Sequence, residues 1–558
     1  MKNNWKKVIS AVLAVALCLS AFAACGGDTT SSTASTASTS SATSSKADGS
    51  EPSTTSTGTG DKIDPTKCEE KMDVSIAVMT GFTQSDSRVE KMLEEKYNVN
   101  IELVVLPGWT DGQSKINLLM ASDETPNIMW WWSMDNDFVQ WKEAGLLQDV
   151  STYLNKYTNI RDYYNKMDPK TLFYATEEDG AIYRIPGDVA EPSCENLWIR
   201  QDWLDALNLE APKTIEDLEE IMRAFTEDDP DGDGQANTYG LGGDGYDFRS
   251  FWPWIQSYDY THYDRWTVDT EGKVGWGPAM PNTQKWVADV AELYGKGYIT
   301  PNITQDTDRD EEMANGGFGV TYSWCAYNNP DSQTMKSFYA SNPDAKWVPV
   351  DPVAGENGNP QEDPATSNAW AFFGITKTAT DPERLYAMYD DMCSLENYVE
   401  RRYGVEGEDY TIDENGLYNP VIAPESEENN TQNIGLNLFN NLFNRKDEGL
   451  ISNTPETKAL FEKSGELSRD RAAQYVEWRN PGDLKVWTPI QTDCGDEKDR
   501  YLWAVVGGEE KADDASWENY IATLNGLGLE DAIADAQEVY DAQAALMEKY
   551  MADKTNQQ

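Results

Sequence analysis

The segment from Trp198 to Leu241, WIRQDWLDALNLEAPKTIEDLEEIMRAFTEDDPDGDGQANTYGL, contains three kinds of local structure in succession. Its first twelve residues are typical of a strand that runs into an amphipathic helix. Thr214 predicts the start of a second helix, because Asp217 stands three residues on in a near capping-box arrangement. Four apolar residues then follow at the spacing of one buried helical face: Leu218, Ile221, Met222 and Phe225. The remainder leaves the helix and ends, at Tyr239-Gly240-Leu241, as the start of a strand.

The loop after this helix, DPDGDGQANTYG, carries oxygen-bearing side chains at regular intervals. Three aspartates alternate, a glycine stands sixth, where a sharp turn needs it, and an asparagine stands ninth. Loops with this spacing wrap a hard cation such as calcium, with a backbone carbonyl as the ligand at position seven. The sequence therefore predicts a structural calcium site with these ligands: Asp229, Asp231, Asp233, Gln235 and Asn237.

A second interpretation of this loop stays open. A complete EF-hand carries a bidentate Glu at position 12, where this chain has Gly240, and no EF-hand helix clearly follows. The alternative is a solvated acidic loop that is held together by Asx turns. A catalytic metal is not expected, because no His stands near the loop.

The same segment resembles the extracellular solute-binding protein family 1, the sugar-binding lipoproteins of bacterial ABC importers. Within that family it is most similar to the LipO/YtcQ-like and alginate-binding-protein-like branch. Arg200-Gln-Asp-Trp-Leu204 matches the Arg-x-Asp-Trp-Leu segment of that branch, and an Asp-Pro-Asp-Gly loop again runs into Tyr-Gly-Leu. The chain has Asp233 where Asn is usual, and Asn237-Thr238 where an acidic pair is common, which weakens the calcium site. The resemblance extends loosely over most of residues 72–550.

The resemblance implies an α/β fold with two lobes, of the periplasmic-binding-protein type (type II, larger cluster D-like). It implies a hinge between the lobes and an extended helical C-terminal part. The expected function is capture of a carbohydrate, an oligosaccharide, in the cleft between the lobes, for uptake through the permease subunits of an ABC importer. The protein is expected to be a monomer and to have no enzyme activity.

The N-terminus has the pattern of a secretory lipoprotein. Residues 1–24 combine a lysine-containing start with an apolar stretch, and small residues stand directly before Cys25. This resembles a lipobox, although Phe22 stands where Leu is usual, and it implies a diacylated (palmitate-bearing) Cys25. Residues 25–70, rich in Ser and Thr, predict a flexible tether. We expect a protein anchored by lipid on the extracellular face of a Gram-positive-type cell membrane; cleavage without lipid and an uncleaved anchor are the alternatives.

Length and charge limit the remaining possibilities. About 490 residues exceed the size of one hydrophobic core, so two lobes are expected. The 97 acidic and 45 basic residues give a net charge of −52, which disfavours nucleic acid and anionic lipid as partners. After Cys25, five cysteines remain without a CxxC motif, and we expect mainly free thiols. The single histidine, His262, does not indicate catalysis.

Alternation of strands and helices between residues 71 and 130 predicts βαβ units and a mainly parallel sheet. We place lobe 1 at residues 71–188 and 352–405. Lobe 2 is expected at residues 192–348 and 406–558, which include the C-terminal helices. The chain is expected to cross between the lobes near residues 187–196 and 349–358.

Aromatic residues near the predicted strand ends are candidates for stacking on sugar rings. Ligands bind beyond the carboxyl ends of strands in open α/β sheets. Three consecutive tryptophans at 130–132 cannot all face one core from a strand, so at least one should be exposed or line a cleft. The alternative for each tryptophan is a place in the core. The predicted ligand-binding residues are Trp131, Trp132, Asp135, Trp252, Trp254, Tyr322, Trp324 and Trp370.

Two other function classes stay open from the sequence. A secreted glycoside-active enzyme would need two carboxylates at a set separation, which 97 acidic residues always allow. However, the chain has no GxSxG, HExxH or P-loop motif, and one histidine leaves little scope for general-base catalysis. A binder of peptides or a sensor subunit would have the same fold.

Overall fold

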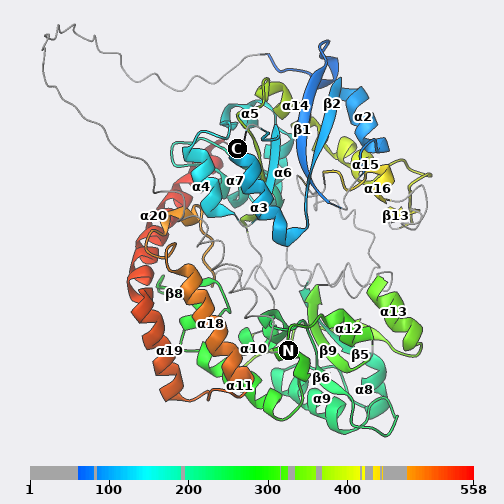
Figure 1. The fold of residues 1–558 in the computed structure, drawn as a ribbon, viewed down its shortest axis with the longest axis vertical. Coiled ribbons are helices and arrows are strands. Elements are labelled where there is room, and N and C mark those ends of the chain that lie inside the picture. Colours follow the sequence, from blue (N-terminus) through cyan, green and yellow to red (C-terminus); the bar gives the residue numbers. More distant parts are fainter. Residues whose placement is uncertain are drawn as a thin grey trace, which may run out of the picture. The chain divides into compact units, whose positions relative to one another are not determined.

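A computed structural model describes residues 61–80, 84–122, 124–132, 134–189, 195–314, 316–324, 333–359, 367–414, 418–421, 431–439, 443 and 474–557. The predicted signal segment, Cys25 and residues 26–60 of the predicted tether lie outside the described residues. Figure 1 shows the order of the elements along the chain. The protein is a mixed α/β structure with two larger sheets, each with its own hydrophobic core.

The first sheet has the strand order β2-β1-β3-β11-β4. Its strands are β1 (Met72–Met79), β2 (Val99–Leu106), β3 (Ile128–Trp132), β4 (Ile185–Val189) and β11 (Ala369–Ile375). Strands β1, β2 and β3 are parallel, as the βαβ pattern predicts. Strand β11 is antiparallel to both β3 and β4, so the sheet is mixed. This strand lies in the segment 352–405 that is predicted to belong to lobe 1, but its antiparallel direction was not predicted.

Helices connect and cover these strands. They are α2 (Arg88–Tyr97), α3 (Trp109–Met120), α4 (Asp135–Glu143), α5 (Ser151–Lys156), α6 (Asn159–Met167), α7 (Lys170–Ala175), α14 (Pro382–Met392) and α15 (Leu395–Tyr403). Helix α2 shows why they form where they do. Ser87 and Glu90 make a reciprocal capping box at its start, and Val89, Leu93 and Tyr97 bury one face.

The second sheet has the order β10-β5-β9-β6. Its strands are β5 (Glu195–Arg200), β6 (Tyr239–Leu241), β9 (Phe318–Trp324) and β10 (Trp347–Pro349). Helices α8 (Gln201–Leu207) and α9 (Ile215–Glu227) follow β5, as the sequence predicts. Thr214 and Asp217 form the capping box of α9, and Leu218, Ile221, Met222 and Phe225 are all buried.

Further elements complete this second part of the fold. They are α10 (Trp252–Ile255), β7 (Trp266–Val268), β8 (Val274–Trp276), α11 (Thr283–Gly295), α12 (Arg309–Ala314), α13 (Gln333–Ser341), α18 (Gln491–Val506), α19 (Asp514–Leu527) and α20 (Leu529–Gln557). Strands β12 (Tyr410–Ile412) and β13 (Tyr418–Pro420) pair with each other, and α16 (Thr431–Ile434) follows. Five short 3-10 helices lie at Pro65–Lys67, Phe248–Phe251, Gly277–Ala279, Pro301–Thr304 and Pro481–Asp483. Within the described residues, no helix is both long and apolar enough for a membrane span.

Packing modifies the predicted lobe boundaries at two places. Val350 and Val353 are buried in the second core, so the chain leaves that core after residue 353 and not at 352. Between Asn359 and Ser367 it passes to β11 of the first sheet. A later stretch packs in the first core, where lobe 2 is predicted: Ile434, Leu436, Leu438, Phe439 and Phe443. These apolar side chains have no regular spacing that would indicate which core they fill.

Candidate ligand and metal sites

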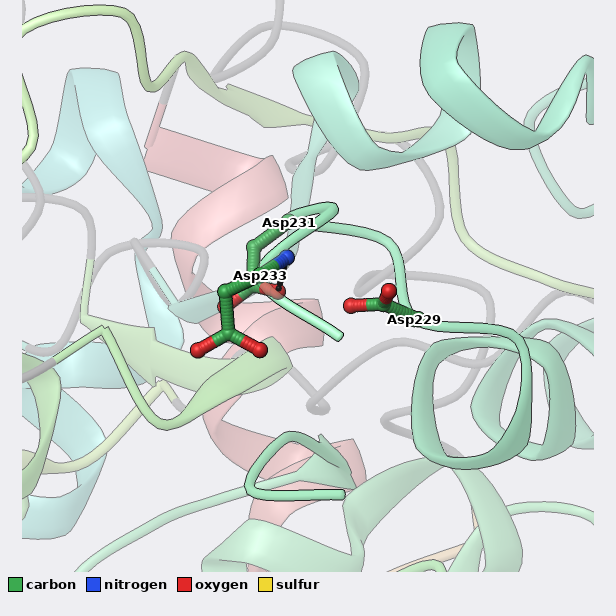
Figure 2. A group of neighbouring side chains, drawn as sticks. All are labelled: Asp229, Asp231 and Asp233. Carbon is green, nitrogen blue, oxygen red and sulfur yellow. Dashed lines mark hydrogen bonds between the residues drawn. The ribbon is translucent and has the colours of Figure 1, made fainter. Parts of the chain in front are cut away.

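The acidic loop between α9 and β6 brings its three aspartates together. One carboxylate oxygen from each of Asp229, Asp231 and Asp233 lies within 4.8 Å of the other two, and Figure 2 shows the three side chains grouped at one turn. Asp229, Gly232 and Gly234 have positive φ angles of 50°, 70° and 79°, which curl the backbone around the carboxylates. Burial raises the pKa of Asp231, and the neighbouring Asp229 and Asp233 raise it further.

Hydrogen bonds within the loop support the turn itself. The backbone N–H of Gly234 donates to Asp229 Oδ2 at 3.0 Å, and the N–H of Gln235 donates to Asp233 Oδ1 at 2.7 Å. The Asn237 amide donates to Asp233 Oδ2 at 3.1 Å. These are the Asx-type contacts of the solvated-loop interpretation. However, Asp229 Oδ1 is buried without a hydrogen-bond partner, which leaves one carboxylate oxygen unsatisfied.

Gly240 occupies position 12 for a packing reason. A Cβ atom at this residue would lie 2.5 Å from the Cβ of Met222 on α9. The close approach of β6 to α9 therefore requires glycine, and a glutamate could not be accommodated there. The loop offers an oxygen-rich donor set that fits calcium, but with fewer carboxylate oxygens than a complete EF-hand.

The three consecutive tryptophans of β3 are all buried, so none of them is exposed to solvent in this conformation. That one of them lines a cleft stays a prediction. Trp131 stacks on Phe138 with ring centroids 6.0 Å apart, and it meets Trp141 edge-on at 5.4 Å. Trp132 lies against α3, so close that a Cβ at Gly112 would be 2.5 Å from its ring. Strand β3 is the central strand of its sheet, and every one of its residues is buried. A strand covered on both faces can bury consecutive large side chains.

The aromatic candidates of the second sheet are also mostly in the core. Trp254 is fully buried and donates from Nε1 to Glu219 at 3.0 Å. Trp252 is buried and stacks on Tyr322 with centroids 6.2 Å apart. An aromatic ring that has no exposed face in this conformation cannot stack on a sugar. Burial therefore favours the core interpretation for these two tryptophans.

The two remaining aromatic candidates differ. Trp370 on β11 is half-buried and meets Trp130 edge-on at 6.5 Å. Trp324 is the last residue of β9, where its backbone pairs with Glu195, and its side chain lies outside the described part of the structure. Their role in ligand binding stays a prediction.

Asp135 is the predicted ligand residue with the most defined geometry. It is the first residue of α4 and follows the carboxyl end of β3 by three residues. Its Oδ1 accepts a hydrogen bond from Arg184 Nη1 at 2.8 Å. The side chain of Asp135 remains 36 % exposed, whereas that of Arg184 is only 2 % exposed. One oxygen of Asp135 is thereby held in place while the carboxylate still reaches solvent.

Arg184 was not predicted as a site residue. It directly precedes β4, and its Nη2 donates to the carbonyls of Tyr174 at 3.1 Å and Arg479 at 2.8 Å. Its guanidinium lies over the rings of Phe138 and Phe372, 4.6 and 4.2 Å from their centroids. The flanking residues give no local signal of this role, because the contacts come from four separate segments.

Two hollows lie among the described residues. A cavity of about 10 Å³ at the amino end of β5 is lined by apolar residues together with Asn196 and Tyr322. Asn196 is buried and its Oδ1 has no hydrogen-bond partner. A larger, open hollow of about 650 Å³ is lined by Lys142, Glu177, Glu178, Asp179 and Tyr183, and within it Lys142 pairs with Glu177 at 2.7 Å. It contains none of the predicted ligand residues.

The single histidine and the cysteines have structural surroundings. His262 is buried, stacks on Tyr263 with centroids 4.5 Å apart, and accepts the backbone N–H groups of Asp264 and Arg265 at Nδ1. Among the described residues, Cys68, Cys393 and Cys494 form no disulfide, and the last two are buried. Cys194 and Cys325 lie outside the described residues.

Residues 89–392, more than half of the chain, match the family model described as bacterial extracellular solute-binding protein. The chain belongs to this family. Among curated relatives, this solute-binding protein is 26 % identical over 361 residues to the polygalacturonan/rhamnogalacturonan-binding protein YtcQ of Bacillus subtilis. That match covers 62 % of this chain and 67 % of YtcQ. It is also 25 % identical to the fructooligosaccharide ABC transporter substrate-binding protein FusA of Streptococcus pneumoniae, over 82 % of this chain and 87 % of FusA.

Solved structures share the fold of this solute-binding protein. FusA in complex with kestose superposes with a TM-score of 0.64 at 20 % identity, over 85 % of this chain and 99 % of FusA. The alginate-binding protein AlgQ2, in a structure without calcium ion, superposes with a TM-score of 0.62 at 20 % identity, over 86 % of this chain and all of AlgQ2. An EF-hand mutant of FusA has also been solved, and it superposes with a TM-score of 0.64 at 21 % identity.

Proposed function

We propose that this protein is the substrate-binding component of an ABC importer and that it captures an oligosaccharide. Membership of the solute-binding family supports binding over catalysis. The curated relatives YtcQ and FusA bind, by name, polygalacturonan/rhamnogalacturonan and fructooligosaccharides, and FusA belongs to an ABC transporter. The permease subunits of such a transporter are the proposed protein partners.

The fold supports capture between two α/β parts. In each of the two sheets, the parallel strands direct their carboxyl ends to one edge, which is where open α/β sheets bind ligands. The observation that carries the proposal is Asp135. It lies just beyond the carboxyl end of the central strand β3, partly exposed, with one oxygen fixed by Arg184. A fixed carboxylate oxygen is a strong acceptor for sugar hydroxyl groups.

Closure of the two parts on the ligand is the proposed mechanism. The chain passes between the two sheets after Val189 and again before Ser367, and it passes from the first core to the second between Phe443 and Val476. Few connections of this kind allow hinge closure, and a ligand that contacts both parts binds the closed state better than the open state. Ligand capture would then shift the open–closed equilibrium toward the closed state.

Calcium at the acidic loop is part of the proposal. Asp229, Asp231, Asp233, the Gln235 carbonyl and the Asn237 side chain would hold the ion. A bound calcium would neutralise the mutual repulsion of the three carboxylates and satisfy the buried Asp229 Oδ1. Its role would be structural, since the loop precedes the amino end of β6, whereas ligands bind beyond the carboxyl ends of strands.

The proposed location is the extracellular face of a cell membrane. A lipid on Cys25 would hold the protein there, and residues 26–60 would act as the tether, because Ile63 and the 3-10 helix Pro65–Lys67 already belong to the folded part. The lipobox-like sequence before Cys25 supports this assignment.

Incubation with oligosaccharides tests binding against catalysis. A reversible change in tryptophan fluorescence, with no new products by chromatography, is the expected result. Turnover of any oligosaccharide would show a glycoside-active enzyme instead. Affinity for a peptide mixture together with no affinity for glycans would favour a peptide binder or sensor subunit.

A further inference from the structure

We propose that the binding site selects neutral oligosaccharides and rejects those built from uronic acids. This inference rests on the proposed function and names the chemical class of the ligand. The two curated relatives differ on this point by name, since polygalacturonan is a polyanion and fructooligosaccharides are uncharged. Whether this protein binds charged or uncharged oligosaccharides depends on the charges at the carboxyl-end edges of its sheets.

The first step concerns Arg184, the cation that contacts Asp135. Its Nη1 is bound to Asp135 Oδ1, and its Nη2 is bound to two backbone carbonyls. Its faces are covered by Phe138 and Phe372, and its side chain is 2 % exposed. Arg184 therefore cannot form the bidentate contact with a ligand carboxylate that arginine makes in uronate and other acid sites.

The second step concerns Asp135 itself. Its carboxylate is partly exposed at the position where a ligand would lie. Ionised carboxylates only accept hydrogen bonds, which suits the hydroxyl groups of a neutral sugar. A uronate carboxylate at the same place would meet a like charge in surroundings of reduced dielectric, where repulsion is stronger than in water.

The third step concerns the segments that join strands at this edge. The described residues of these segments, at 80, 84–87, 107–108, 134, 242–247, 350–359 and 367–368, include no Lys or Arg. Described residues of these segments contribute acidic side chains instead: Asp86, Asp244, Asp247, Asp351 and Glu356. Two arginines begin the helices that follow, and both have carboxylate partners: Arg88 pairs with Asp409, and Arg249 with Asp247.

These charges make a polyanion an unfavourable ligand. Each uronate ring carries one carboxylate, and taking it out of water requires a paired cation. The carboxyl-end edges of the sheets offer hydrogen-bond acceptors and negative charge. A neutral oligosaccharide of the same length avoids both the cost of desolvating carboxylates and the repulsion between like charges.

Calorimetry at pH 7 and low ionic strength tests this selection with the full-length protein. The neutral probes are nystose, maltotetraose, xylotetraose, mannotetraose and the methyl ester of tetragalacturonic acid; the acid probes are tetragalacturonate and tetramannuronate. We expect at least one neutral probe to bind, and both acid probes to bind at least about tenfold more weakly than the best neutral one. An acid probe that binds most tightly would overturn the inference and leave the proposed function intact. If no probe binds, both this inference and the proposed function fail.

A matched pair of variants tests the part assigned to Asp135. Asp135→Asn removes the charge and changes the acceptor, whereas Asp137→Asn makes the same change one half-turn later in α4. We expect Asp135→Asn to weaken the best neutral probe about tenfold and Asp137→Asn to change its affinity less than about twofold. Melting curves of both variants report any loss of fold. Equal losses of affinity in the two variants would remove Asp135 from the site and overturn the inference.

Discussion

At the scale of single residues, the buried charges are the features that sequence patterns could not predict. Arg184 contacts groups from four segments of the chain, and none of its neighbours in sequence indicates this. Asp135 was predicted as a ligand residue, but its fixed geometry comes from Arg184. The buried tryptophans Trp131 and Trp254 show the opposite case. Their aromatic character suggested a ligand platform, whereas Trp131 on β3 and Trp254 on α10 both lie in the core.

The acidic loop gives the first prediction at this scale. A metal that binds only the folded protein stabilises it by mass action, so chelation with EDTA should lower the melting temperature. Asp231→Ala should remove this sensitivity, while Asp205→Ala, a change of an exposed carboxylate on α8, should retain it. A melting curve of the native protein that is unchanged by EDTA would contradict calcium binding.

Asp289 gives a prediction about pH. Burial raises its pKa to about 6, and Glu219, Glu356 and Glu292 act in the same direction against a hydrogen bond from Tyr258. The folded state therefore binds the proton more tightly than the unfolded state, and stability from this group falls as pH rises from about 4 to about 6. Asp289→Asn should raise the melting temperature relative to native protein at pH 7 and lose this advantage at pH 4. A difference that does not change with pH would contradict this assignment.

At the scale of elements, sequence patterns predicted the helices and strands whose position depends on interactions between neighbouring residues. Helices α8 and α9 and strand β6 lie where the local sequence pattern placed them, because capping and one buried face are properties of neighbouring residues. The antiparallel entry of β11 between β3 and β4 was not predicted. Nor was the packing of residues 434–443 in the first core. Both depend on contacts between segments far apart in sequence, which single-sequence patterns do not contain.

The start of α9 provides a prediction for this scale. The Asp217 N–H donates to Thr214 Oγ1 at 3.3 Å, and the Asp217 carboxylate accepts the Thr214 N–H at 3.2 Å. Thr214→Ala should lower the free energy of unfolding by about 1 kcal/mol, because one amide of the first turn loses its acceptor. Thr214→Ser keeps the acceptor and should be close to native in urea denaturation. Equal losses in both variants would mean that the methyl group, and not the cap, stabilises the helix.

At the scale of the whole molecule, Ser367 and Asn368, at the entry to β11, are hydrogen-bonded to the C-terminal segment. The half-buried Glu477 carboxylate accepts the backbone N–H groups of Ser367 at 3.0 Å and Asn368 at 2.8 Å. Gln543 on α20 donates to the Glu477 carbonyl at 2.7 Å. These hydrogen bonds hold the entry to β11 in place, next to one of the passages between the two sheets. A closing motion would therefore have a defined hinge there.

The predicted lipid anchor gives a test on intact cells. Cys25→Ser should move the protein from the membrane fraction to the medium, since the lipid is the proposed anchor after signal removal. Cys68→Ser, a change of a free thiol in the folded part, is the control and should stay at the membrane. Retention of Cys25→Ser at the membrane would show that residues 8–24 remain as an uncleaved helix.

Capture by closure is the central claim, and small-angle X-ray scattering tests it most directly. The native protein should be titrated with the neutral oligosaccharide that binds most tightly by calorimetry. We predict that the radius of gyration falls and saturates with the calorimetric dissociation constant, while chromatography of the same samples shows the sugar unchanged. Saturated binding with an unchanged radius, or cleavage of the sugar, would contradict the account.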